Sequence, residues 1–232
     1  MYQARRAWPL FEAARHGKTA GALDLLKDGA DPNARVFKGG LPLNEAVREG
    51  HAEVVQVLLE HGAEPTEFAM RRATERRRHQ IMRLLIGADY DPAAEDDGRG
   101  TTALHHVRGD TVAARILLDA GAHVNARSAS DQTPLLLAVE SPEVTRILLE
   151  AGAEPNVRDE YLEMTPLEWA AERGALGSAR LLLEHGADPI MRWRGRTAVE
   201  VARESGHKRI AKLIEQYADG EEEGQDEAGQ SE

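Results

Sequence analysis

Three histidines are the residues whose chemistry stands out first in this sequence. His105 and His106 are adjacent, and His123 follows in the same stretch. Imidazole is a common zinc ligand, but a zinc site needs further ligands, and no carboxylate or cysteine lies at ligand spacing beside these residues. The chain has no cysteine at all, so a thiolate nucleophile and a disulfide framework are excluded. The histidines are therefore predicted to be structural.

No other stretch has the spacing of a catalytic or cofactor site. The glycine-rich segment 98–102 lacks the GxxxxGK[ST] spacing of a phosphate-binding loop, and no GxSxG nucleophile elbow is present. The acidic residues are spread along the chain rather than paired. We therefore expect neither an enzyme nor a cofactor. An enzyme with an unrecognised site stays an alternative, and mutation of a His or Asp cluster would then abolish turnover.

Composition and charge narrow the class of protein further. The formal net charge is −11, which disfavours general nucleic-acid binding because phosphate contacts need clustered Lys and Arg. The N-terminus lacks the apolar run of a signal peptide, and no apolar stretch reaches a membrane-spanning length. These features predict a soluble, cytoplasmic protein with no membrane partner. If the source is a eukaryote, a nuclear location is the alternative.

One basic island interrupts this acidic chain. Six arginines are separated by only one acidic residue, Glu75: Arg71, Arg72, Arg76, Arg77, Arg78 and Arg83. They could form a solvated face whose stems cover apolar surface, or a dock for an acidic partner segment. Two further alternatives are nucleic-acid binding, which would be strongly salt-dependent, and an intramolecular contact with the acidic residues 221–227.

The segment 165–187 shows how the chain is organised. Thr165 is a predicted N-cap followed by proline at the first helical position, and Glu168 completes a capping box. Gly174 separates this helix from a second, leucine-rich helix that ends at Gly186. Two helices this short cannot bury enough apolar surface to offset the entropy of ordering them, so the unit needs neighbours of the same kind.

The chain supplies those neighbours. Helix-ending Gly-Ala pairs recur 25 to 34 residues apart, at Gly29, Gly62, Gly87, Gly121, Gly152 and Gly186. First-helix starts such as Thr133-Pro134-Leu135 keep the same order. A period of about 33 residues with two helices is typical of ankyrin repeats. The sequence therefore resembles the ankyrin-repeat family over nearly its whole length.

This resemblance implies an all-α fold, an ankyrin-repeat solenoid of about seven helix-turn-helix units with β-hairpin-like fingers. The repeat domain is expected over residues 1–218, and the acidic tail 219–232 is expected to be disordered. The predicted units are about 8–35, 36–65, 66–92, 93–127, 128–158, 159–191 and 192–218.

Some units depart from the repeat pattern. Trp8 replaces the capping threonine of unit one, and units four and five are two residues short between their helices. Unit three lacks both the start motif and the turn glycine. We expect its second helix to be cut short before Gly87, with a local distortion of the stack. Pro142 is predicted to begin the second helix of unit five.

The family resemblance also implies a function and a surface. Family members bind partner proteins through the fingers and the concave face of the first helices, and the histidine at position 105 hydrogen-bonds within and between repeats. We expect a monomeric protein-interaction module or scaffold. A regulator or inhibitor of a partner enzyme is the alternative. The implied contact residues are Phe37, Lys38, Arg48, Glu49, Arg99, Thr101, Ser130, Gln132, Tyr161, Leu162, Met164, Glu172, Arg173, Trp193, Arg194 and Arg196.

Overall fold

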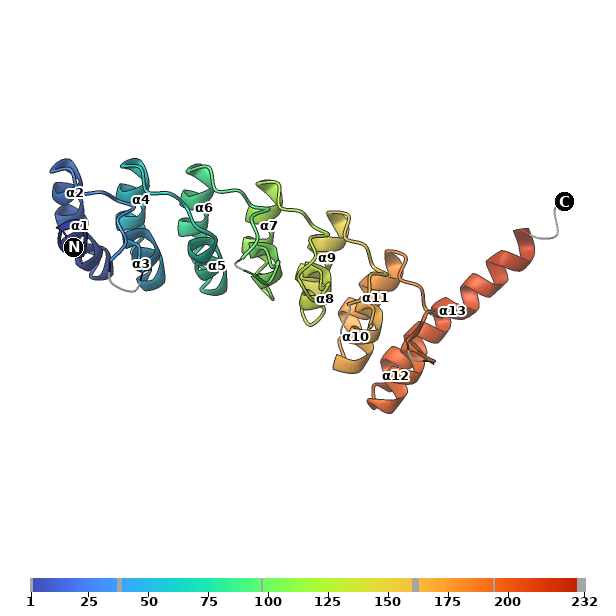
Figure 1. Cartoon of the computed structure of the whole chain (residues 1–232). Helices are drawn as coiled ribbons and strands as arrows, with labels where there is room; N and C mark the ends of the chain where they lie inside the picture. Colours follow the sequence, from blue (N-terminus) through green and yellow to red (C-terminus); the bar gives the residue numbers. More distant parts are fainter. Residues whose placement is uncertain (1, 37–38, 97, 160–162, 194, 229–232) are drawn as a thin grey trace.

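The computed structural model describes residues 2–36, 39–96, 98–159, 163–193 and 195–228. Seven helical pairs follow one another along a curved row (Figure 1). The first members of the pairs are α1 (Tyr2–Arg15), α3 (Pro42–Glu49), α5 (Glu67–Glu75), the 3-10 helix η2 (Ala103–His106), α8 (Pro134–Ala138), α10 (Pro166–Arg173) and α12 (Ala198–Glu204). The second members are α2 (Thr19–Lys27), α4 (Ala52–Glu60), α6 (His79–Gly87), α7 (Thr111–Asp119), α9 (Pro142–Glu150), α11 (Leu176–Glu184) and α13 (Lys208–Ala228).

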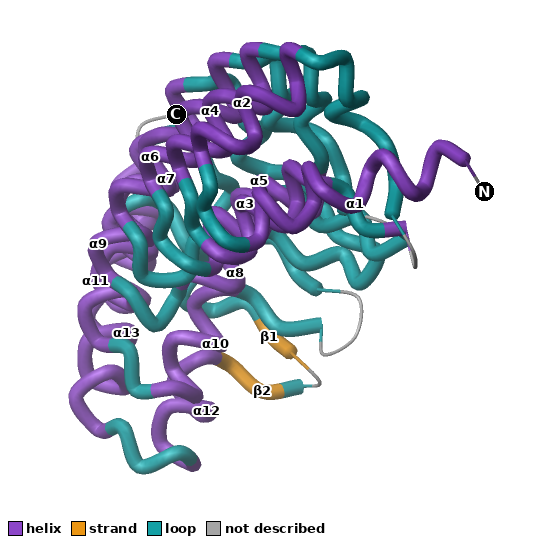
Figure 2. The backbone as a smooth tube through the Cα atoms, turned by 90° about the vertical axis from the view of Figure 1, so that its left-hand side faces the viewer, coloured by secondary structure: helices purple, strands orange, loops and turns teal. Residues whose placement is uncertain are grey.

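The pairs form two parallel rows that share one core. Each first helix packs on the first helix of the next unit, and the second helices pack on one another in the same way. Figure 2 looks along both rows from the N-terminal end, with the long connecting loops on the same side as β1 and β2. Buried leucine, alanine and valine side chains form one continuous apolar cluster from Leu10 to Ile214. Each unit is thus covered by its neighbours, which is why the repeat is stable only as an array.

The predicted helix caps are confirmed. The Thr165 hydroxyl accepts from the backbone N–H of Glu168 at 3.3 Å, and the Glu168 carboxylate accepts from the Thr165 N–H at 2.7 Å. The same reciprocal box joins Thr197 and Glu200. Pro142 begins α9 as predicted, behind the Ser141 cap.

Unit three is more regular than its sequence suggests. Its second helix α6 has nine residues, as α4 does, so the expected shortening before Gly87 is wrong. The left-handed residue that ends this unit is Asp89, with φ 62°, whereas the pair Gly87-Ala88 lies two residues too early. An aspartate tolerates this conformation because its short polar side chain can bond locally. Tyr90 is then buried where other units bury an alanine.

The first unit begins differently from expectation. Trp8 is not a cap: α1 begins at Tyr2 and contains Trp8, which is exposed and stacks on Phe11 with ring centroids 5.8 Å apart. At the other end of the chain, α13 runs from Lys208 to Ala228. The disorder predicted for the acidic tail 219–232 stays a prediction.

The fingers are hairpin-like, as predicted. Each is closed at its base by a backbone hydrogen bond, for example Val36 N–H to Gly40 O at 2.9 Å and Ser128 N–H to Gln132 O at 3.0 Å. Unit seven forms two short antiparallel strands, β1 (Arg192–Trp193) and β2 (Arg196–Thr197). Unit three has no finger, because α5 begins only a short turn after α4 ends.

Side-chain amides connect the linkers of successive units. The Asn125 amide donates to Gly152 O at 3.1 Å, and its oxygen accepts from the Glu154 N–H at 2.9 Å. Asn33 and Asn156 form the same pair of bonds to the following unit. The two equivalent positions that flank unit three hold Thr66 and Ala93 instead.

Candidate functional site

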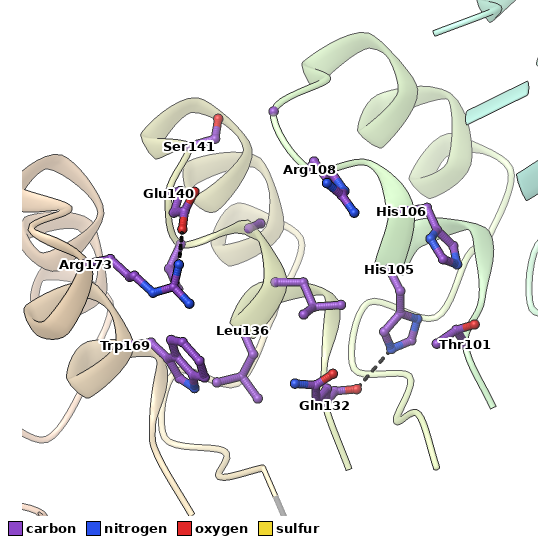
Figure 3. A pocket seen from close by; sticks show the side chains of 14 residues that line it. Thr101, His105, His106, Arg108, Gln132, Leu136, Glu140, Ser141, Trp169 and Arg173 are labelled. Carbon is purple, nitrogen blue, oxygen red and sulfur yellow. Dashed lines mark hydrogen bonds and ion pairs between the residues drawn. The ribbon is translucent and has the colours of Figure 1, made fainter. Parts of the chain in front are cut away.

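A hollow of about 580 Å³ opens on the first-helix face over units four to six (Figure 3). Finger residues form one edge and turn residues the other, with helix side chains between them. The lining residues are Thr101, His105, His106, Arg108, Gly109, Gln132, Leu136, Leu137, Ala138, Val139, Glu140, Ser141, Trp169 and Arg173.

The hollow exists because two first helices are short. η2 has four residues and α8 has five, whereas α3 and α10 have eight each. The second helices α7, α9 and α11 keep nine residues each. Units four and five therefore hold their place in the stack but present less helix on this face. The shortened turns noted in the sequence are the cause.

The floor of the hollow is apolar and one wall is charged. Leu136 is buried, but Leu137 beside it is 40% exposed and half-buried Trp169 stands opposite. The Arg173 guanidinium lies 5.0 Å from the centre of the Trp169 ring and 2.9 Å from the Glu140 carboxylate. The Arg173–Glu140 ion pair is exposed and contributes little to stability. Arg173 can therefore exchange Glu140 for a carboxylate of a partner protein.

The histidines have the structural role expected from the resemblance. His105 Nδ1 accepts the Thr102 N–H at 3.0 Å, which leaves Nε2 to donate to Gln132 O in the next unit at 3.0 Å. Burial lowers the pKa of His105. Burial also lowers the pKa of His106, although Glu75 opposes the shift from 4.0 Å. The His105 contact to Gln132 O holds the finger edge of the hollow in place.

The basic island divides into three parts. Arg71 and Arg72 pair with Glu75 and lie over the Phe68 ring. Burial would raise the pKa of Glu75, but the two guanidinium groups outweigh it and lower that pKa. Arg71 also contacts Asp96 at 3.0 Å. The charges of Arg71 and Arg72 are therefore largely neutralised by these two carboxylates.

Arg78 is a structural residue rather than a dock. Its guanidinium donates to Val47 O and to Arg48 O in the preceding unit and covers Gly50. His51 and His207 make the equivalent contact in other units, to Arg15 O and Glu172 O. Of the five arginines predicted as the dock (Arg71, Arg72, Arg76, Arg77 and Arg78), only Arg76 and Arg77 are exposed.

The predicted fold-back of the acidic tail is not the arrangement found. α13 packs on α11 and α12 at the far end of the row and points away from α5 and α6 (Figure 1). Units four, five and six lie between the tail and the arginines in this arrangement.

The predicted contact residues are only partly brought together. Thr101, Gln132 and Arg173 line the hollow. Met164 is 2% exposed in the core, because it precedes the Thr165 cap and faces the stack, so a partner contact at Met164 is wrong. The remaining described positions do not line the hollow and lie at exposed or half-buried sites along units two and four to seven: Arg48, Glu49, Arg99, Ser130, Glu172 and Arg196. Phe37, Lys38, Tyr161, Leu162, Arg194 and the side chain of Trp193 lie outside the described residues.

Sequence reasoning missed the residues that give the hollow its apolar character. Leu137 and Trp169 look like ordinary core residues of an amphipathic helix in the sequence. The deletions in units four and five were the available signal, since a shorter helix leaves neighbouring side chains uncovered. Only the packing shows which side chains those are.

The part of the chain that the structure describes has neither a candidate metal cluster nor a candidate membrane span. No group of three or more His, Asp and Glu side chains there could hold a metal ion. Within the same residues, every helix is too short or too polar to cross a bilayer.

Comparison with known families matches most of the chain. The model "Ankyrin repeats (3 copies)" matches residues 70–159, and the model "Ankyrin repeat" matches residues 38–68 and 163–193. These matches cover the predicted units two to six and confirm the repeat pattern read from the sequence.

Curated relatives include proteins of very different size. Rat cyclin-dependent kinase 4 inhibitor B is 36% identical over 122 residues, covering 51% of this chain and 91% of the inhibitor. A Caenorhabditis elegans transient receptor potential cation channel subfamily A member 1 homolog is 30% identical over 182 residues, which span 75% of this chain but 15% of the channel. Human palmitoyltransferase ZDHHC13 is 30% identical over 84% of this chain and 29% of its own length.

Solved structures agree with the family matches. The ankyrin repeat domain of Bcl-3, described as a unique member of the IkappaB protein family, superimposes with a TM-score of 0.75 at 27% identity, covering 88% of this chain and 97% of that domain. Human ASB11 has the same fold, with a TM-score of 0.74 at 24% identity. Sequence, helix-pair geometry and these comparisons converge, and the chain belongs to the ankyrin-repeat family.

Proposed function

We propose that this chain is a protein-interaction module that binds a partner protein through the first-helix face, centred on the hollow over units four to six. Exposed Leu137 beside Trp169 and Arg173 is the observation that carries the proposal. Tryptophan and arginine dominate the energetics of many interfaces, and an exposed leucine adds apolar area that a partner can bury.

The scaffold favours binding without rearrangement. The hollow is held open by the neighbouring helices and by the His105 contact to Gln132. A preformed surface avoids much of the entropic cost of ordering an interface. The finger tips of units two, six and seven extend the proposed contact through Phe37, Tyr161 and Trp193.

Affinity capture with matched variants tests this function. Leu137→Asp places a charge on the floor of the hollow, whereas Val112→Asp places the same charge on α7 at a residue that is also 40% exposed. In lysate of the source organism, the wild type and Val112→Asp should recover the same partner in stoichiometric amount. Leu137→Asp should recover at least tenfold less, with an unchanged thermal midpoint. Equal recovery by all three proteins would contradict the proposal.

A Tyr161→Ala/Trp193→Ala variant tests the contribution of the fingers separately. Loss of partner in this variant, with retention in Leu137→Asp, would move the binding surface from the hollow to the finger tips.

A stoichiometric inhibitor of a partner enzyme is the second candidate. It rests on the relatives named cyclin-dependent kinase inhibitors, from rat and from human, of which this chain covers 91% and 87%. If the captured partner is an enzyme, its activity should fall to near zero at a one-to-one ratio with the wild type. Activity that is unaffected at that ratio would favour an adaptor role.

A further inference from the structure

Two arginines beside the hollow adopt a backbone conformation that normally belongs to glycine. The turn residue two positions before the second helix is glycine in units one, two, six and seven, with φ of 67°, 90°, 74° and 80°. Unit three has Arg77 at this position with φ 54°. Arg108, in the shortened turn of unit four, has φ 46°. A side chain in the left-handed region costs free energy that glycine avoids.

These two residues lie at the same edge of the hollow. Arg108 lines it directly (Figure 3). An Arg77 Nη atom lies 3.9 Å from the position of a Cβ on Gly109, which is also a lining residue. The two guanidinium groups thus come from successive units onto one rim.

The guanidinium groups of this rim form no ion pair with a described carboxylate, although the charge of Arg77 is one of the causes that lower the pKa of Asp110. Among the residues that the structure describes, no carboxylate lies within 4.0 Å of the guanidinium of Arg76, Arg77 or Arg108. The nearby Asp110 is engaged as the cap of α7 and accepts from His79 at 2.7 Å. This contrasts with Arg71 and Arg72, which share Glu75. Arg77 and Arg108 thus combine a strained, left-handed backbone with a guanidinium that forms no ion pair. Strained residues are often found at functional sites, so this combination points to a role in binding.

The rim and the floor together define the chemistry of a ligand. We propose that this site binds an acidic segment of the partner protein, with one large aliphatic side chain on Leu136, Leu137 and Trp169 and its carboxylates against Arg77 and Arg108. The inference rests on the proposed function and adds the partner's chemistry to it. The acidic remainder of a chain of net charge −11 repels the acidic surface of other copies, whereas the basic rim attracts a short acidic segment, so complementarity gives selectivity.

Selection from an unbiased library of displayed dodecapeptides on the immobilised full chain tests the ligand chemistry. The enriched peptides should share one Leu, Ile, Met or Phe with at least two Asp or Glu within a few residues. Enrichment of basic or uncharged peptides, or of no common sequence, would overturn the proposal.

The decisive variant is Arg77→Gly/Arg108→Gly. Glycine fits both turn conformations, so the thermal midpoint should stay the same or rise. Affinity for the selected peptide, measured by fluorescence anisotropy, should be at least tenfold lower than that of the wild type. The wild type should lose affinity between about 50 and 300 mM salt, because salt screens surface charge, and this salt dependence should largely disappear in the variant. Equal affinity in wild type and variant would overturn the proposal. Arg83→Gly is unsuitable as a control because it weakens α6, so Arg83→Ala serves and should bind normally.

Two further outcomes separate the alternatives. If Arg77→Gly/Arg108→Gly still captures the partner that Leu137→Asp loses, the hollow is a binding surface and only the acidic chemistry is wrong. A synthetic peptide of residues 219–232, which has no large aliphatic side chain, should bind at least tenfold more weakly than the selected peptides. Tighter binding of this tail would make a second copy the occupant and overturn the proposal.

Discussion

The joints on the two sides of unit three use different chemistry from the joints between units four, five and six. In the latter, Asn125 and Asn156 each make two bonds to the next linker. Around unit three, Thr66 is used as the cap of α5 and Ala93 has no side-chain amide.

Charged side chains make contacts at these joints, where the amides are missing. Arg78 reaches back to unit two, while the contacts Arg71–Asp96 and His79–Asp110 reach forward to unit four. The same fold is therefore maintained by neutral hydrogen bonds in one region and by ionic groups in another. The comparison shows that a degenerate repeat can keep its place in the stack if other side chains bridge the same gap.

The largest effect is expected from Arg78→Ala. The substitution removes two hydrogen bonds from a charged donor and uncovers Gly50, so the free energy of unfolding should fall by about 2–3 kcal/mol. Urea denaturation measures this change. Arg83→Ala, an exposed arginine of the same unit, should change stability by less than about 0.5 kcal/mol. Equal effects of the two substitutions would show that the Arg78 contact is not a joint.

Asn156→Ala should cost less, because its two hydrogen bonds are neutral and partly exposed. We expect a loss of about 1–2 kcal/mol. Amide hydrogen exchange should show faster opening of units six and seven, with unit two unchanged. Uniform acceleration over the whole chain would indicate global unfolding instead of a local joint.

Acidification should destabilise the hollow through its two histidines. Burial lowers the pKa of His105 and His106 below the ordinary histidine value of about 6.5, so the unfolded chain takes up protons that the native state does not. Stability is therefore full above pH 6.5 and falls as the pH drops below it, by at most about 1.4 kcal/mol per pH unit for each histidine.

Urea midpoints at pH 7.5, 6.5 and 5.5 measure this dependence. A His105→Gln/His106→Gln variant should have a flatter dependence than the wild type. A wild-type midpoint that does not move between pH 7.5 and 5.5 would contradict the linkage.

The smallest effect tests whether the missing amide can be restored. Ala93→Asn should let unit three donate to Gly121 O and accept from the His123 N–H, by analogy with Asn125. We expect the free energy of unfolding to rise by about 0.5–1 kcal/mol. Ala129→Asn, in an exposed finger, is the control and should have no such effect. Destabilisation by Ala93→Asn would mean that the linker of unit three follows a different path.

Most of the fold could be predicted from the sequence because capping residues and helix-ending glycines mark the boundaries of most units. The Thr165–Glu168 box and the glycines after second helices, such as Gly186, depend on local chemistry that sequence displays directly. Asp89 was missed because an aspartate in the left-handed conformation has no local signature, and the nearby Gly87 was a plausible substitute. Trp8 was misplaced because the first helix has no preceding repeat to fix its start.

The candidate site was less accessible to sequence reasoning. Thr101, Gln132 and Arg173 follow from their positions in the repeat, but the exposure of Leu137 depends on how much helix units four and five present. Met164 shows the opposite error, because a residue at the base of a finger can face the core or the solvent. Packing between units likewise decides which arginines are paired, which are structural and which are exposed. The spacing of residues within one unit does not predict these contacts. The partner-binding roles of the finger tips stay predictions.

The charged joints around unit three have a mechanical consequence. Dissolved ions weaken attractions between surface charges but act little on amide hydrogen bonds, so added salt should soften the third repeat while both flanks keep their stiffness. The array would then flex at one hinge, and its curvature would depend on the electrolyte around it.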